Sequence, residues 1–81
     1  MPALENDPRH GRLRSLLAEA RTGKGLSQVT LAERLGKTQI WVSRYERGAR
    51  QISVIEFIDI AQAIGVDPCR LLRKLTNSVN G

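Results

Sequence analysis

The stretch GKTQIWVSRYERG, residues 36–48, mixes hydrogen-bonding and apolar side chains in a way that suits neither a surface helix nor a buried one. Arginine and lysine donate charged hydrogen bonds, which can bind phosphate, and glutamine can donate and accept at once. A solvated helix has no use for many apolar residues, and a buried helix rarely carries two arginines. The apolar residues are Ile40, Trp41, Val42 and Tyr45. The polar residues that could bind a partner are Gln39, Ser43, Arg44 and Arg47, flanked by Lys37 and Arg50. This mixture predicts a helix that faces two different partners.

Positive charge is concentrated in the N-terminal half of the chain. Residues 8–50 hold ten lysines and arginines and three acidic residues, whereas residues 51–81 hold three of each. Together with the overall net charge of +5, this distribution is compatible with a polyanionic partner. The alternative is that the arginines serve solubility only.

The composition excludes several classes of protein. With 81 residues, 41% of them hydrophobic and 26% charged, the chain predicts a single soluble domain. No apolar run approaches the roughly 20 residues that cross a bilayer, and no signal region opens the chain, so we expect no membrane partner. The single cysteine, Cys69, cannot form an internal disulfide, so we expect a cytoplasmic protein. A single histidine, His10, and a single cysteine form no cluster for a metal, and nothing resembles a nucleophile–base set, so we expect no enzyme, no cofactor, no metal and no small-molecule ligand.

Turn and capping residues divide the chain into five segments of helical period. They open at Asp7-Pro8, Ser27, Thr38, the S-x-x-E capping box at Ser53, and Asp67-Pro68. The fold class is therefore all-α, a compact five-helix domain over residues 8–75, with flexible segments at 1–7 and 76–81. The expected core is Leu13, Leu16, Leu17, Ala20, Leu31, Ala32, Leu35, Val42, Tyr45, Phe57, Ile60, Ala61, Ile64, Leu71, Leu72 and Leu75.

The second and third segments are separated by only two or three residues. Gly36 permits a sharp turn, so we expect two helices that cross steeply as a helix-turn-helix over about residues 27–47. Ala32 is small enough for a close crossing, and Leu35 and Val42 are placed to fill the wedge between the helices. Such pairs also occur in helical bundles that bind nothing. The polar set on the third helix favours a binding role.

The stretch GLSQVTLAERLGKTQIWVSRYERGARQISVIEFIDIAQAIGV closely resembles the phage-repressor family of helix-turn-helix proteins, also called Cro-like or XRE-type. The resemblance covers about residues 12–75 and implies the lambda-repressor-like DNA-binding fold. It also implies a bacterial or phage protein of the cytoplasm, nucleoid-associated when DNA is bound. It rests on an ordered set of matching elements, which are Ser27-Gln28, Leu31-Ala32, Leu35-Gly36, Val42-Ser43, Glu46-x-Gly48 and Ile60-Ala61-x-Ala63-Ile64-Gly65-Val66.

The resemblance implies specific contacts with double-stranded DNA. The expected base contacts come from Gln39, Ile40 and Arg44, with Ser43 as a lesser candidate. The expected backbone contacts come from Gln28, Lys37, Thr38, Trp41, Arg47 and Arg50. Gln28 is also expected to brace the next helix. Arg21 and Glu46 match a family ion pair that joins the first helix to the third, the alternative being that both are solvated.

Trp41 departs from the family pattern, in which a small polar residue is common. Two positions remain open for it. The indole can lie along the DNA backbone at the rim of the helix, which we favour, or it can pack against the second helix near Gln28. The core side of this helix is already occupied by Val42 and Tyr45. Because successive residues of an α-helix are rotated by about 100°, Trp41 lies beside that side and not on it.

Ile55 and Ile58 lie off the core stripe of the fourth helix and predict a homodimer surface, unless Ile58 is a core-edge residue. The expected function is a dimeric, repressor-like regulator of transcription that binds a palindromic operator through the recognition helix, residues 38–47. The alternative is an antitoxin or another protein-interaction module on the same fold. Only about six residues follow the fifth segment, which is little for a partner-binding extension.

Overall fold

The computed structural model describes residues 7–80, and in that range it contains five α-helices and no strand. The helices are α1 (Pro8–Gly23), α2 (Gln28–Leu35), α3 (Gln39–Glu46), α4 (Val54–Ile64) and α5 (Pro68–Asn80). The all-α fold class is confirmed. Of the N-terminal segment predicted to be flexible, residues 1–6 lie outside the described range, and Asp7 caps α1 by accepting a hydrogen bond from the Arg9 backbone N–H.

Local capping signals set most helix ends. Ser27 and Thr38 cap α2 and α3 through their hydroxyls, and Ser53 and Glu56 form the predicted capping box of α4. Gly36 ends α2 in the left-handed conformation, with a φ of 68°, which a glycine adopts without strain. These helix ends confirm the sequence prediction. The prediction was possible because each capping residue acts within one turn of the helix end that it marks.

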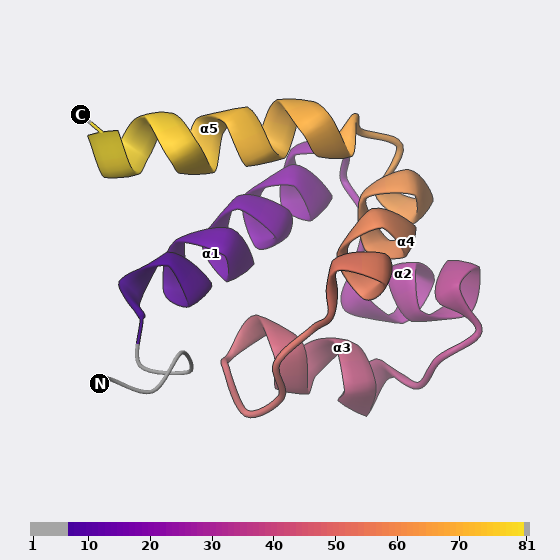
Figure 1. Cartoon of the computed structure of the whole chain (residues 1–81). Helices are drawn as coiled ribbons and strands as arrows, with labels where there is room; N and C mark the ends of the chain where they lie inside the picture. Colours follow the sequence, from indigo (N-terminus) through magenta and orange to yellow (C-terminus); the bar gives the residue numbers. More distant parts are fainter. Residues whose placement is uncertain (1–6, 81) are drawn as a thin grey trace.

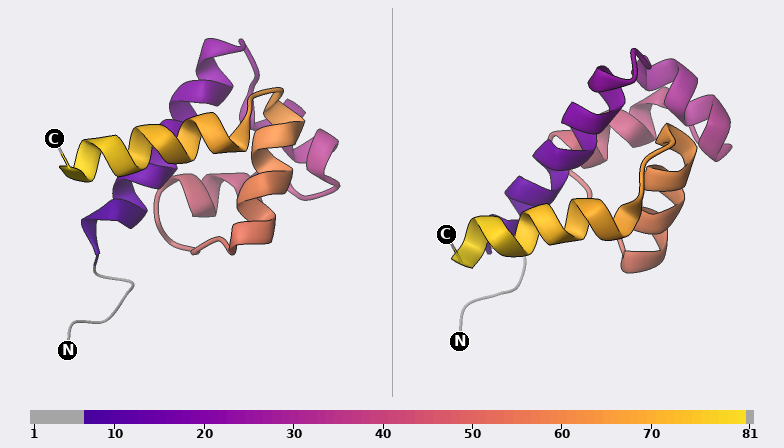
Figure 2. Two further views of the ribbon diagram at one scale, coloured as in Figure 1. Left: turned by 45° about the horizontal axis from the view of Figure 1, so that its top comes forward. Right: turned by 90° about the horizontal axis from the view of Figure 1, so that it is seen from above.

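The helices enclose one core, in which α1 packs against both α3 and α5, and α5 lies on the side opposite α3. In Figures 1 and 2, α5 crosses α1 on one side of the molecule, whereas α3 lies on the other. The fully buried side chains include Leu17, Leu31, Val42, Tyr45 and Ile60. Burying one such side chain stabilises the fold by roughly 1.5–3 kcal/mol, so the core holds the inner faces of all five helices in place.

Three sequence expectations about the last two helices need correction. Leu72 is 40% exposed, because it lies 100° from Leu71, which alone of the two faces the core. Ile58 is half-buried and packs against the core, so it is the core-edge residue that was the alternative to an exposed position. The helix predicted to end at Leu75 continues to Asn80, since no glycine or proline interrupts residues 76–80.

Candidate nucleic-acid interface

The turn between α2 and α3 fixes the direction of α3. The Lys37 backbone N–H donates to the Ala32 carbonyl oxygen at 2.9 Å, which closes the end of α2 around Gly36. The Trp41 backbone N–H then donates to the Thr38 hydroxyl at 3.1 Å, which starts α3 two residues later. Ala32 is 3% exposed at the crossing of the two helices, where a small side chain permits close approach. The short turn therefore leaves α3 little freedom relative to α2.

The two faces of α3 have opposite environments. Val42 and Tyr45 are completely buried, whereas Ile40 is 59% exposed. Gln39, Arg44 and Arg47 are exposed as well. Ser43 is half-buried, and its hydroxyl accepts a hydrogen bond from Arg47 Nε at 3.3 Å. The mixed composition of this helix thus corresponds to one face in the core and one face open to solvent.

A chain of side-chain hydrogen bonds ties α3 to both preceding helices. Arg21 of α1 donates to Glu46 through Nε at 2.7 Å and a terminal nitrogen at 3.1 Å, a bidentate ion pair that is nearly buried. Gln28 Nε2 donates to Glu46 Oε1 at 2.9 Å, and Gln39 Nε2 donates to Gln28 Oε1 at 2.7 Å. A further donor of Arg21 reaches the Leu26 carbonyl oxygen at 2.7 Å. The network fixes both ends of α3, because Gln39 and Glu46 are its first and last residues.

Arg50 differs from the other candidate phosphate-binding arginines. Its two terminal nitrogens bind the Glu56 carboxylate at 3.1 and 2.9 Å, and one also donates to the Gln51 carbonyl oxygen. The hydrogen bonds from Arg50, followed by that from the Ser53 backbone N–H, hold the pKa of Glu56 below its usual range. The charge of Arg50 is therefore largely compensated within the protein.

Trp41 is half-buried and lies across from α4, a placement that the sequence did not predict. Its ring meets the Tyr45 ring edge-on, with 5.5 Å between centroids, and Arg50 lies 4.9 Å from the Trp41 centroid. Lys37 lies 5.3 Å from the same centroid. Trp41 packs against the core and lines one pocket with Leu35, so it lies beside the last residue of α2, whereas Gln28 is the first residue of that helix. Trp41 is a half-buried rim residue that carries two cations on its ring.

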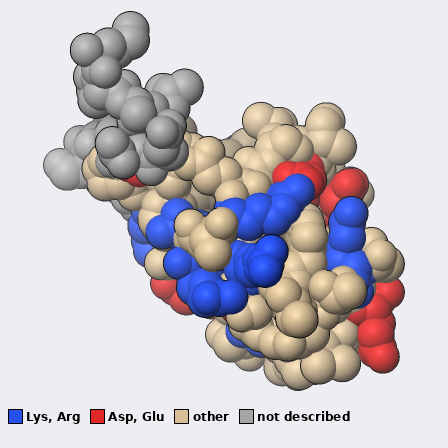
Figure 3. Space-filling model, turned by 90° about the horizontal axis from the view of Figure 1, so that it is seen from below, with Lys and Arg blue, Asp and Glu red and all other residues tan. Residues whose placement is uncertain are grey.

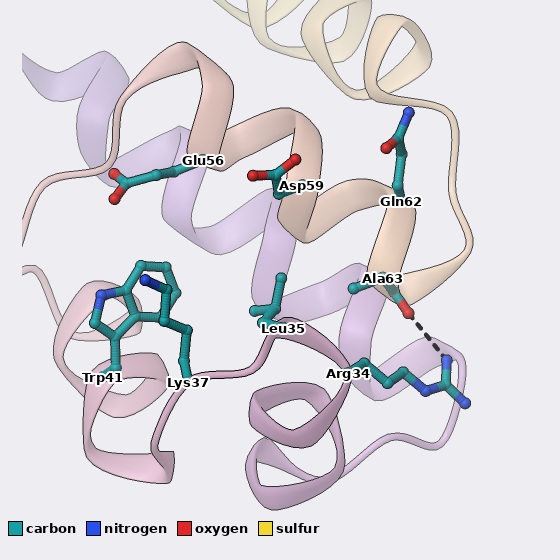
Figure 4. Close-up of a pocket in the computed structure, with 8 residues that line it drawn as sticks. All are labelled: Arg34, Leu35, Lys37, Trp41, Glu56, Asp59, Gln62 and Ala63. Carbon is teal, nitrogen blue, oxygen red and sulfur yellow. Dashed lines mark hydrogen bonds between the residues drawn. The ribbon is translucent and has the colours of Figure 1, made fainter.

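That pocket, of about 390 Å³, does not extend the candidate anion surface. Figure 4 shows Trp41 and Lys37 on one side and the α4 side chains Glu56, Asp59 and Gln62 on the other, with the hydrogen bond from Arg34 to the Ala63 carbonyl oxygen at its end. Two carboxylates disfavour a phosphate there. The pocket thus separates α3 from the outer face of α4.

The side of the molecule that carries α3 is basic. In Figure 3, which views the molecule from that side, lysine and arginine side chains gather across the middle of the face, and acidic side chains lie mainly at its edges. Among the described residues, Arg44 has no ion pair, and Arg47 contacts only the Ser43 hydroxyl. These cations are consequently available to an anionic partner.

Other kinds of site find little support in the described part of the chain. Residues 7–80 contain no group of histidine, cysteine and acidic side chains that could hold a metal ion. Cys69 is exposed and forms no disulfide. None of the described helices is both long enough and apolar enough to cross a membrane.

Comparison with known proteins places this geometry in a family. The helix-turn-helix family model matches residues 17–71, from the middle of α1 into α5. An XRE-family-like protein from Pseudomonas syringae is 46% identical and superposes with a TM-score of 0.84, covering 86% of this chain and 85% of that one. This chain belongs to the XRE-type helix-turn-helix family of transcription regulators.

Two further proteins are similar to this chain over most of their length. The uncharacterised HTH-type transcriptional regulator y4dJ of Sinorhizobium fredii is 40% identical over 58 residues, which are 72% of this chain and 75% of that protein. The restriction-modification controller protein C.AhdI of Aeromonas hydrophila is 35% identical with a TM-score of 0.71, and the match covers 82% of this chain and 99% of C.AhdI. The resemblance inferred from the sequence is therefore confirmed at the level of the family.

Proposed function

We propose that this protein is a dimeric, sequence-specific regulator of transcription that binds double-stranded DNA with α3 in the major groove. The observation that carries the proposal is the two-sided environment of α3. Gln39, Ile40 and Arg44 are exposed on a helix whose opposite face is buried and whose two ends are tied by hydrogen bonds. A rigid helix with exposed hydrogen-bonding groups suits the major groove, which admits one α-helix.

Each proposed base contact has a distinct chemistry. Arg44 can pair with guanine O6 and N7, and Ile40 can contact a thymine methyl group. Gln39 donates one amide hydrogen to Gln28, which leaves its second N–H and its carbonyl oxygen for the two hydrogen bonds that adenine offers. Ser43 has a smaller role in this proposal, because its hydroxyl is half-buried and contacts Arg47.

The proposed backbone contacts differ in strength. Lys37, Thr38 and Arg47 are exposed around α3 and can bind phosphates directly. Gln28 retains one free amide hydrogen after its bonds to Glu46 and Gln39, and this hydrogen can reach a phosphate. Arg50 and Trp41 are weaker candidates, since Arg50 is paired with Glu56 and stacks on Trp41.

The proposed dimer surface lies on α4. Val54 and Ile55 are 71% and 67% exposed at the start of this helix, and adjacent exposed aliphatic side chains favour association. Ile58 can contribute only from the edge of that surface, because it packs against the core. A two-fold dimer would present its α3 helices to two half-sites about 34 Å apart, which corresponds to a palindromic operator. Repressor-like action at that operator is part of the same proposal.

In vitro selection from a random double-stranded pool tests the proposal. We expect enrichment of a palindromic consensus with two half-sites about one helical turn apart. Selection repeated with Arg44→Ala should lose preference at one position per half-site, which corresponds to about 1–3 kcal/mol of discrimination. Failure of the wild-type protein to enrich any sequence would contradict the proposed function. A consensus without symmetry would contradict the dimer alone.

A further inference from the structure

Arg14 of α1 lies against the end of α3, although the two are more than thirty residues apart in the sequence. A Cβ atom built on Gly48 would lie 2.9 Å from Cζ and from one terminal nitrogen of Arg14, and 3.2 Å from its Nε. Because three atoms of the planar guanidinium are nearly equidistant from this point, the plane of the group faces the Gly48 backbone. Gly48 has a φ of 82°, so the position favours glycine, and glycine also leaves the space that Arg14 fills.

The guanidinium of Arg14 has no acidic partner among the described residues. Neither a hydrogen bond nor an ion pair joins it to any of residues 7–80, although the side chain is half-buried. By contrast, Arg21 and Arg50 each bind a carboxylate through two nitrogens. A guanidinium that is held in place and keeps its donors unused is suited to an external anion.

The loop after α3 connects the Gly48 position that Arg14 contacts to the last turn of α3. The backbone N–H groups of Ala49 and Arg50 both donate to the Arg44 carbonyl oxygen, at 2.8 and 3.2 Å. Residues 48–50 therefore fold back onto the last turn of α3, the turn next to Arg47. Arg14 therefore lies against the loop that follows the α3 residues Arg44 and Arg47.

We propose that Arg14 binds a phosphate of the DNA backbone beside the groove that α3 occupies. This inference rests on the proposed function, since it assigns one more contact to the same interface. The ends of a helix in the major groove approach the sugar–phosphate strands, and a guanidinium fixed beside such an end meets phosphates rather than bases. Planar bidentate donors match phosphate oxygens well. The contact positions the domain on DNA without reading its sequence.

A structural role is the competing explanation, because a cation near the C-terminal end of a helix also stabilises the helix dipole. Salt dependence separates the two roles. We compare wild-type protein with Arg14→Met, which keeps an apolar stem, and Arg14→Lys, which keeps the charge. Affinity is measured for the selected operator and for an unrelated duplex over a series of salt concentrations, and urea unfolding is measured for each variant.

We expect Arg14→Met to weaken binding to both duplexes by about eightfold at 0.1 M salt, and to reduce the slope of log affinity against log salt by about 0.9. Arg14→Lys should restore most of the slope. The matched control is Arg73→Met on α5, on the side of the molecule opposite α3, which should leave affinity and slope unchanged.

The outcomes distinguish this inference from the proposed function. If Arg14→Met binds both duplexes with wild-type affinity and slope, Arg14 does not contact DNA, and the proposed function stands. If the variant unfolds more easily and its weaker binding keeps the wild-type slope, Arg14 is structural and the inference is wrong. If the wild-type protein binds no duplex at all, the proposed function fails and the inference with it.

Discussion

Two groups of arginines surround α3, and they differ in their partners. Arg21 and Arg50 are each held by a carboxylate, Glu46 and Glu56, through two hydrogen bonds. Arg14, Arg44 and Arg47 have no carboxylate partner among residues 7–80. The first group joins helices to one another, and the second presents charge to the exterior. The same side chain thus serves the scaffold or a partner, depending on whether an acid faces it.

This difference changes how the charge of the domain is interpreted. The sequence count of ten basic residues between 8 and 50 treats all cations alike. In the structure, part of that charge is compensated locally, and the uncompensated arginines gather around the exposed face and the end of α3. The local arrangement of unpaired cations, rather than the net charge, is therefore the better guide to the interface.

The largest expected effect comes from breaking the buried pair. Arg21→Met should lower the free energy of unfolding by about 3 kcal/mol, because it leaves the Glu46 carboxylate nearly buried without its partner. Urea unfolding measures this change. Arg12→Ala is the control, since Arg12 and Glu19 are exposed and 3.7 Å apart, and exposed pairs contribute little. Equal free energies of unfolding for Arg21→Met and Arg12→Ala would show that the Arg21–Glu46 pair stabilises the fold no more than an exposed pair does.

A second experiment compares one arginine of each group. Arg47→Ala should reduce the slope of log affinity against log salt by about 0.9 and leave stability nearly unchanged. Arg50→Ala should lower the stability and leave the salt slope nearly unchanged, because it removes the ion pair with Glu56 and the cation above the Trp41 ring. Salt-dependent DNA titration and thermal unfolding of both variants give the two readouts. If Arg50→Ala lowered the salt slope as much as Arg47→Ala, the division between the groups would be wrong.

The helix ends and the inner face of α3 were predictable from the sequence, because both depend on local patterns. A serine or threonine cap acts within one turn, as at Thr38, and helical period places Val42 and Tyr45 on one side. Leu72 was mispredicted because an apolar residue beside the core stripe looks like part of it. Which of Leu71 and Leu72 faces the core depends on how α5 packs against α1, and the sequence alone does not show this packing.

The partners of individual side chains were less predictable. The position of Trp41 across from α4 and the pairing of Arg50 with Glu56 depend on the path of the loop between α3 and α4. The contact of Arg14 with Gly48 depends on how α1 packs against the same loop. No spacing along the chain encodes these contacts, since each joins elements whose relative placement is a property of the whole fold.

The comparison of partnered and unpartnered groups extends to Tyr45 in the core. Its hydroxyl is buried and has no hydrogen-bond partner among the described residues, and burial, followed by the nearby Glu46 charge, raises the pKa of this group. Because an unsatisfied buried hydroxyl is unfavourable, Tyr45→Phe should raise the free energy of unfolding by about 1 kcal/mol. Tyr45→Leu, which also removes the ring that contacts Trp41, should lower it. A loss of stability in Tyr45→Phe would show that the hydroxyl has a favourable interaction.

The smallest expected effect is the pH dependence of the Arg50–Glu56 pair. Hydrogen bonds from Arg50 hold the pKa of Glu56 below the ordinary value of 4.5, so the folded state favours the ionised carboxylate. This contribution is fully present above pH 4.5 and is lost as the pH falls from there through the lowered pKa.

Glu56→Gln retains a side chain that can complete the capping box but cannot form the ion pair. Wild-type protein should therefore melt a few degrees above Glu56→Gln at pH 7, and the two melting temperatures should converge as the pH falls through the lowered pKa of Glu56. Asp7, whose pKa is lowered to about 2 by Arg9, is present in both proteins and cancels from the difference. A difference in melting temperature that stayed constant from pH 7 to pH 3 would assign the effect of Glu56 to helix capping instead of to its pairing with Arg50.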